Sequence, residues 1–230
     1  MIAALALSAA VQPSFAGVDF GASAQSVVTR LGDPAYALDD SGGKRYAWLV
    51  DGFAHEYVTV FFTRNSVSEV VVTRSSPSSD DPIGALGVKI GAPEKTMASL
   101  PAPDADGLIA GDGGLLYHFT AEDGIVHKIF ALLPKDVRDA LPAAPAALIH
   151  GGTSFADALV IGATSETTGV AAEYAYLDLN DCGPGGHWKS KGQSLATDKG
   201  KPYDVLDAVC TVGGAERTFY FDISRYFGKL

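Results

Sequence analysis

A cysteine and a histidine stand five residues apart in the C-terminal third of the chain. The glycine-rich bend in Cys182-Gly-Pro-Gly-Gly-His187 could bring the imidazole to the thiol and make it the base for a nucleophilic cysteine. The segment supplies no third group to orient His187, and Cys210, the second cysteine of the chain, would be left without a role. A disulfide between Cys182 and Cys210 accounts for both, because an even pair in an oxidising compartment is most simply bonded. Closing a loop of about 28 residues stabilises a fold by roughly 3 to 4 kcal/mol.

Other catalytic and metal-binding patterns are absent from the sequence. It has no Gly-x-Ser-x-Gly elbow, phosphate loop or Cys-x-x-Cys, and in the start of a His-Glu-x-x-His motif at His55 the second histidine is replaced by Thr59. His118 and His127 lie on the two arms of one expected hairpin. Their alternation with the apolar residues of that hairpin predicts opposite faces of the sheet, so we expect no metal site and no cofactor.

Paired carboxylates offer a second route to acid–base chemistry. Residues 39–40 and 80–81 are both Asp-Asp, but each pair stands in a Ser-, Gly- or Pro-rich turn, where Asp is favoured for local backbone hydrogen bonds. We therefore expect solvated loops there. A small periplasmic hydrolase, using Cys182 and His187 or a carboxylate pair, remains the alternative function.

Composition limits the class of protein further. The chain has 230 residues, 47% of them apolar, and a formal net charge of -10. This is too apolar for intrinsic disorder, yet no unbroken apolar run reaches the roughly 20 residues of a membrane span. No cluster of Lys and Arg forms the basic patch that a nucleic acid or an anionic membrane would need, so we expect neither as a partner.

The N-terminal residues resemble an export signal. Residues 1–11 are apolar except for Ser8, and Ser14-Phe15-Ala16 places small residues at positions −3 and −1 of a cleavage site. We therefore expect a signal peptide over residues 1–16 and a periplasmic or secreted protein. No Lys or Arg precedes the apolar run, so the basic segment of an ordinary signal peptide is missing. No cysteine follows the run, so we expect no lipid anchor. A buried N-terminal helix is the alternative.

An internal similarity organises the next two thirds of the chain. Residues 17–27 and 87–97 share a Gly-Val-x-x-Gly-Ala pattern, followed in one copy by Ser23 and in the other by Pro93, both suited to a helix start. The pattern predicts short helices over 24–31 and 94–100. After each helix, runs rich in Val, Phe, Tyr and Thr predict an antiparallel meander of three strands. These strands are expected at 45–50, 56–63 and 67–73, and at 107–110, 114–120 and 125–132.

The glycine-centred segments carry a resemblance to a known family. Phe20-Gly21-Ala22, Val27 and Leu31-Gly32-Asp33-Pro34, followed by aromatic strands, resemble the SmpA/OmlA family of small outer-membrane lipoproteins. A tandem pair of such units, here 17–74 and 87–133, is similar to the β-lactamase-inhibitor-protein fold. The resemblance covers residues 17–133 and implies a fold, with no chemistry attached. The lipid-anchor cysteine of those lipoproteins is missing, and only the first copy has the Leu-Gly-x-Pro ending.

The remaining segment, residues 153–230, predicts a small α+β domain that we assign to no family. Residues 158–161 are an apolar run typical of a buried strand, and Ser165 and Glu166 open a helix to about residue 177. Three further strands are expected over 188–196, 204–212 and 217–223. The fold class expected for the whole chain is therefore α+β: two tandem helix-plus-meander repeats, then a domain with a three-stranded antiparallel sheet.

Aromatic residues give the strongest functional signal. Val58, Val60 and Phe62 should pack on the helix, which leaves Tyr57 and Phe61 on the other side of the strand. Tyr46, Trp48 and His118 could join them on this face. An aromatic, partly polar sheet face is typical of protein-binding surfaces, and the alternative is that these rings are core. We therefore expect an exported, non-catalytic protein-interaction module with an envelope protein as its partner.

Overall fold

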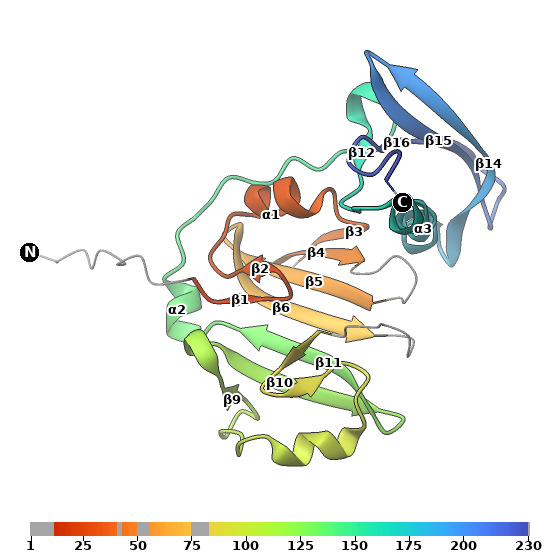
Figure 1. Ribbon diagram of the computed structural model, residues 1–230. Coiled ribbons are helices and arrows are strands. Elements are labelled where there is room, and N and C mark those ends of the chain that lie inside the picture. Colours follow the sequence, from red (N-terminus) through yellow and green to blue (C-terminus); the bar gives the residue numbers. More distant parts are fainter. Residues whose placement is uncertain (1–11, 41–42, 50–55, 75–82, 230) are drawn as a thin grey trace, which may run out of the picture.

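The computed structural model describes residues 12–40, 43–49, 56–74 and 83–229. Its larger unit is an antiparallel sheet of seven strands in the order β3-β4-β5-β6-β11-β10-β9 (Figure 1). The strands are β3 (Tyr36–Asp40), β4 (Gly43–Leu49), β5 (Glu56–Thr63), β6 (Ser66–Arg74), β9 (Ile109–Ala110), β10 (Leu116–Glu122) and β11 (Ile125–Leu132). The pairing of β6 with β11 joins the strands of both expected repeats into one continuous sheet.

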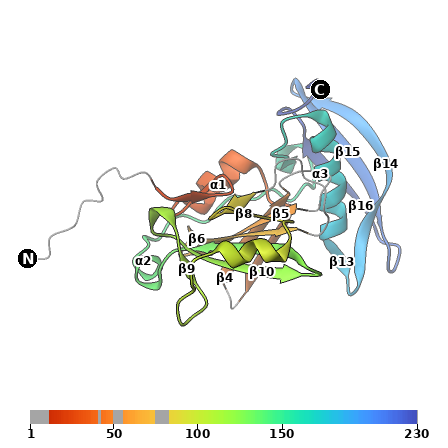
Figure 2. The ribbon, with the colours of Figure 1, turned by 60° about the horizontal axis from the view of Figure 1, so that its bottom comes forward.

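One face of this sheet forms the main hydrophobic core. Directly paired residues lie on the same face of an antiparallel sheet, so the register defines rows of side chains across it. One such row runs through residues that are each no more than 6% exposed: Trp48, Val58, Val72, Ile129 and Phe119. Figure 2 shows the elements that cover this face on one side of the sheet. They are α1 (Ala24–Leu31), the 3-10 helix η1 (Glu94–Ser99), and the hairpins β1 (Ser14–Phe15) with β2 (Val18–Asp19) and β7 (Gly84–Ala85) with β8 (Val88–Lys89).

The two similar segments, around Gly21 and Gly91, are bound to the sheet by matching backbone hydrogen bonds. Gly21 N–H donates to the carbonyl of Val67 at 2.9 Å, and Gly91 N–H donates to that of Val126 at 2.8 Å. In return, Val67 and Val126 each donate to the alanine that follows the glycine, at 2.9 and 2.8 Å. Both glycines have positive φ, 76° and 74°, a conformation that disfavours residues with a Cβ.

The helices after these glycines differ in kind. The hydroxyl of Ser23 accepts a hydrogen bond from Ser26 N–H at 3.1 Å, and α1 follows over the residues that the sequence predicts. Pro93 stands at the equivalent position without a side-chain acceptor, and η1 stays a 3-10 helix with no buried residue. The second helix is therefore tighter and more peripheral than the sequence predicts.

The C-terminal unit has its own sheet and core. Its strands are ordered β12-β16-β15-β14-β13, with β12 parallel to β16 and the others antiparallel. Helix α3 (Glu166–Leu179) packs against it with Gly169, Glu173 and Leu177 buried at i, i+4 spacing. The strands are β12 (Leu159–Val160), β13 (Asp181–Gly183), β14 (Gly186–Asp198), β15 (Lys201–Cys210) and β16 (Glu216–Asp222). Short helices η2 (Asp112–Gly114), α2 (Lys135–Asp139) and η3 (Phe155–Asp157) stand in connections.

The expected fold class is wrong. Strands make up 44% and helices 20% of the residues that the structure describes, so this part of the chain is mostly β. Two self-contained helix-plus-sheet repeats are not formed, because the strands of both segments share one seven-stranded sheet. The C-terminal sheet has five strands instead of three, since the short strands β12 and β13 add to the three that periodicity predicts. The apolar run at residues 158–161 predicts a strand where β12 lies, but not its parallel pairing with β16. The three-residue β13 carries too few alternating residues to be recognised in a sequence.

The residues around the expected cleavage site are packed into the fold. Ser14 and Phe15 form β1, which pairs with β2, and Phe20 N–H donates to the Pro13 carbonyl at 2.9 Å. Phe15 is 6% exposed, and its ring meets that of Tyr117 edge-on at 5.9 Å. Cleavage after residue 16 would remove this core ring. Residues 1–11, the rest of the expected signal peptide, lie outside the described residues.

Candidate functional site

The side of the seven-stranded sheet that faces away from α1 carries mostly half-buried side chains, with Ala47 and Val71 buried among them. We call it the open face. Two rows across it are defined by the register of β4, β5, β6, β11 and β10. The first row is Ala47, Thr59, Val71, Phe130 and His118. The second row is Arg45, Phe61, Glu69, Leu132 and Leu116.

Apolar and charged groups alternate on the open face. Phe61, Phe130 and Leu132 keep part of their surface accessible, in contrast to the core rings on the covered face. Glu69 lies between Phe61 and Leu132 in the register, and burial raises the pKa of its carboxyl although the nearby Arg138 guanidinium lowers it. A set of rings around one partly desolvated carboxyl offers a partner both apolar area and a specific polar contact.

Tyr57 lies on the same face at one end of β5. It pairs with Leu49 on one side and Thr73 on the other. Burial raises the pKa of its hydroxyl, and the Asp178 carboxylate of α3 raises it further, so the group remains a hydrogen-bond donor. Tyr57 and Phe61 are therefore placed together on this face, as the alternation of β5 predicts.

Tyr46 and Trp48 do not join them. Tyr46 pairs with Val60 and Trp48 with Val58, which puts both on the covered face, where each is 5% exposed. The indole Nε1 of Trp48 donates to the carbonyl of Gly32 at 3.1 Å. The expectation that they share a face with Tyr57 and Phe61 is wrong, because the offset between β4 and β5 cannot be read from alternation within either strand.

His118 lies on the open face, but its position differs from the sequence match. In the first hairpin Phe61 pairs with Glu69, and at the equivalent place of the second hairpin Thr120 pairs with Lys128. Thr120 therefore corresponds to Phe61, and His118, two residues earlier, corresponds to residue 59. A shift of two residues leaves the face unchanged. The His118 ring lies 5.6 Å from that of Phe130, and its Nδ1 lies 3.1 Å from the Gly107 carbonyl.

The two cysteines form the disulfide that their number predicts. Cys182 and Cys210 are bonded, with their Cα atoms 5.7 Å apart. The bond ties β13 to the end of β15, and Trp188 pairs with Cys210 beside it. With Cys182 bonded, the chain offers no thiol to His187, so this structure does not support the hydrolase alternative that depends on that pair.

A buried carboxyl pair escaped the sequence reasoning. Glu173 is fully buried on α3; Tyr226 donates a hydrogen bond to its Oε1, and its Oε2 accepts none from a described residue. Burial, with a contribution from Asp204, raises the pKa of Glu173 to about 8. Burial raises the pKa of the neighbouring Asp204 carboxyl as well, although the hydrogen bond that it accepts from Gln193 Nε2 at 2.8 Å lowers it. Glu173 is therefore the group that holds a proton at neutral pH. The signal was available in the i, i+4 spacing of Gly169, Glu173 and Leu177, which marks one helix face.

The remaining predicted groups lie apart. Asp39 is an exposed residue of β3 whose carboxylate lies 3.5 Å from Lys44 Nζ, and residues 80–81 are outside the described part of the chain. Within the described residues, no three His, Cys, Asp or Glu side chains are grouped to hold a metal ion. Nor does any described helix have the length and apolar character to cross a membrane.

Comparisons with known proteins identify no relative. No protein-family model, no curated protein and no solved structure matches the chain.

Proposed function

We propose that this is an exported, non-catalytic envelope protein that binds another protein through the open face. The observation that carries the proposal is the row of partly accessible side chains at Phe61, Glu69 and Leu132, continued by Phe130 and His118 in the next row. Rings with few rotatable bonds lose little entropy when a partner covers them. Glu69 would then select a partner that brings a hydrogen-bond donor or a cation to the centre of the contact.

The matched hydrogen bonds at Gly21 and Gly91 support the internal similarity of the two segments, on which the proposed resemblance to the SmpA/OmlA family for residues 17–133 rests. The same local arrangement occurs twice: a glycine with positive φ allows the segment before a helix to form backbone hydrogen bonds with a strand of the sheet. We propose that the family relationship concerns this local arrangement. Export also remains a proposal, and the disulfide supports it because such bonds persist in oxidising compartments.

Capture of envelope proteins by the purified chain tests the proposal. A Phe61→Ala/Phe130→Ala variant should lose the partner, because truncating buried interface anchors costs about 2 kcal/mol or more, equivalent to roughly thirtyfold in affinity. Its melting temperature should change little if the rings are partly exposed in the free protein.

Leu195 offers a matched control, since it is an exposed apolar side chain, 60% accessible, on β14 of the other sheet. Leu195→Ala should capture the partner as the unaltered chain does. Equal loss of capture by both variants, or unfolding of the double variant, would show that the open face is not a specific binding surface.

A further inference from the structure

A cavity of about 280 Å³ lies between the two units of the molecule. Its wall on the first unit includes Leu31, Trp48 and Val58, and its wall on the second includes Ile161, Ala172 and Tyr176. The larger sheet therefore supplies one side of the cavity, and α3 with the segment after β12 supplies the other. Neither unit alone encloses it.

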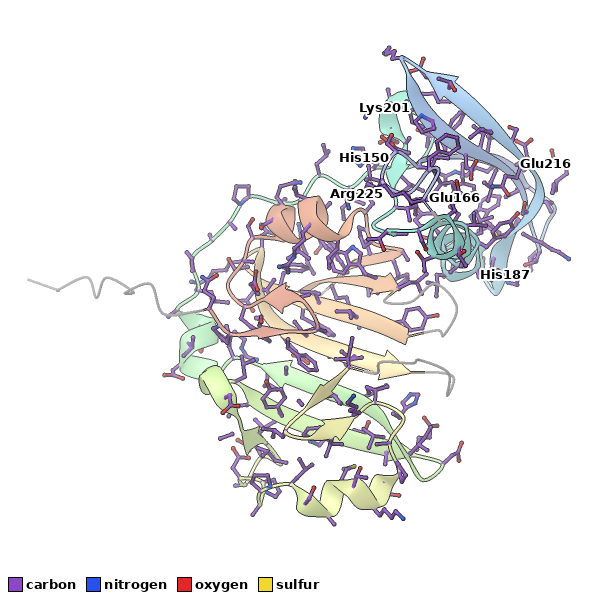
Figure 3. The ribbon with its side chains drawn as sticks, in the orientation of Figure 1. His150, Glu166, His187, Lys201, Glu216 and Arg225 are labelled. Carbon is purple, nitrogen blue, oxygen red and sulfur yellow. A yellow bond between two sulfur atoms is a disulfide. The ribbon has the colours of Figure 1, made fainter. Side chains whose placement is uncertain are left out.

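The two walls are held in a fixed relation by backbone contacts. A Cβ at Gly162 would lie 1.6 Å from the carbonyl oxygen of Leu31, and a Cβ at Gly32 would lie 2.5 Å from that of Val160. Only glycine permits this approach at either position. Arg225 adds hydrogen bonds to the carbonyls of Thr29 and Arg30 at the end of α1, at 2.7 and 3.3 Å (Figure 3). The cavity is consequently preformed.

The polar groups along the cavity are largely satisfied within the protein. Trp48 Nε1 is bonded to Gly32, and the Asp33 carboxyl accepts hydrogen bonds from Val160 N–H at 2.9 Å and pairs with His150 Nδ1 at 2.6 Å. No Lys or Arg is among the lining residues. A cationic ligand would find one opposite charge in the lining, the carboxylate of Asp33, and that group is already paired with His150. An anionic ligand would find no Lys or Arg among the lining residues.

Tyr176 is the lining residue that combines an aromatic ring with a hydroxyl. Its hydroxyl makes no hydrogen bond to a described residue, although its ring packs edge-on against Phe219 and Phe221 at 6.0 and 5.8 Å. Burial raises the pKa of this hydroxyl, Arg217 lowers it, and Asp33 and Asp157 raise it, so it stays protonated. The cavity thus combines apolar walls with the Tyr176 hydroxyl, which makes no hydrogen bond to a described residue.

We propose that this cavity binds a small uncharged molecule, mostly apolar, with one oxygen that accepts a hydrogen bond from Tyr176. Its volume is suitable, since an engineered apolar cavity of about 150 Å³ binds benzene. This inference is independent of the proposed protein-binding residues Phe61, Glu69 and Phe130, none of which lines the cavity. It assigns the junction a binding role in addition to joining the two units.

Titration of the full chain with three single-ring probes tests the charge requirement. Benzyl alcohol should bind saturably, measured by calorimetry and by a change in Trp48 fluorescence in a Trp188→Phe background. Benzoate and benzylamine, of similar size, should bind at least about tenfold more weakly, because burying a charge costs more than burying a hydroxyl. Absence of saturable binding by benzyl alcohol, or equal binding of all three probes, would overturn the proposal.

Two substitutions on α3 locate the binding site. Ala172→Leu fills the cavity and should abolish benzyl alcohol binding, whereas Ala171→Leu, on the same helix but away from the lining, should leave it within about twofold. If Ala172→Leu does not fold, Tyr176→Phe provides the test: it should weaken benzyl alcohol about fivefold and leave toluene unaffected, as expected for one lost hydrogen bond. Benzyl alcohol would bind outside the cavity if Tyr176→Phe left its affinity unchanged and Ala172→Leu had no more effect than Ala171→Leu.

Discussion

The carboxyl Oδ2 of Asp33 lies 2.6 Å from the imidazole Nδ1 of His150, at the junction between the two units. Asp33 stands just after α1, and only 1% of its side chain is accessible. The same oxygen accepts a hydrogen bond from Val160 N–H, while Asp33 N–H donates to the Val160 carbonyl at 2.8 Å. Asp33, which follows the Gly32 cap of α1, therefore attaches the second unit to the end of the first helix.

Replacing Asp33 should loosen this junction. Asp33→Ala leaves the donors of His150 and Val160 without an acceptor, which should lower the free energy of unfolding by about 2 to 4 kcal/mol. Urea unfolding and protease cleavage of the segment around residue 150 measure the effect. Asp19→Ala is the control, because its ion pair with Arg30 is half-exposed and should contribute less than about 1 kcal/mol. Equal effects of the two substitutions would contradict this role.

The N-terminal hairpin should be required for stability. Phe15→Ala removes a core ring and should cost about 3 to 5 kcal/mol. A chain that begins at Gly17 should be similarly destabilised in urea. If export removes an N-terminal segment, mass spectrometry of the secreted protein should find the new terminus before Pro13. A stable protein beginning at Gly17 would restore cleavage after residue 16.

Reading of the sequence succeeded where the evidence was local. The boundaries of α1, the alternation of β5 and the cysteine pair need only neighbouring residues or a count. It failed where the answer depends on which strands lie side by side. No pattern of neighbouring residues indicates that β6 pairs with β11, and this pairing determines the fold class. Nor does any such pattern indicate that the register of β4 pairs Trp48 with Val58, and this register determines which residues lie on the open face.

Stability of the C-terminal unit should fall as the pH rises toward 8. The pKa of Glu173 is raised from 4.5 to about 8 in the folded protein, so between these values the folded chain holds a proton that the unfolded chain has released. This contribution is complete below about pH 4.5 and lost above about pH 8. One pKa unit corresponds to about 1.4 kcal/mol, so the loss between pH 5 and 8 should be a few kcal/mol.

Urea unfolding at pH 5 and 8 measures this change. Glu173→Gln stays neutral at both pH values and should flatten the dependence, whereas Glu216→Gln, on the exposed end of β16, should keep it. A stability that rises with pH in the unaltered protein but not in Glu173→Gln would show that the carboxyl is ionised in the folded state.

The disulfide should contribute to the same unit. A Cys182→Ser/Cys210→Ser variant should lose about 3 kcal/mol of unfolding free energy, because the bond closes a loop across 28 residues of sequence. Thiol titration of the denatured, unreduced protein provides the direct check and should find no free thiol. Two titratable thiols would show that the cysteines are not bonded in the mature chain.

Site-specific photo-crosslinking tests the binding role of the open face most directly. A photoreactive amino acid at position 130, on the open face, should join the chain to one protein of the envelope in a discrete product. The same group at position 174, which is also accessible but lies on α3, should not. A discrete product from position 130 that disappears with Phe61→Ala is the predicted result. The same products from both positions, or none from position 130, would contradict the proposal that the open face binds a protein.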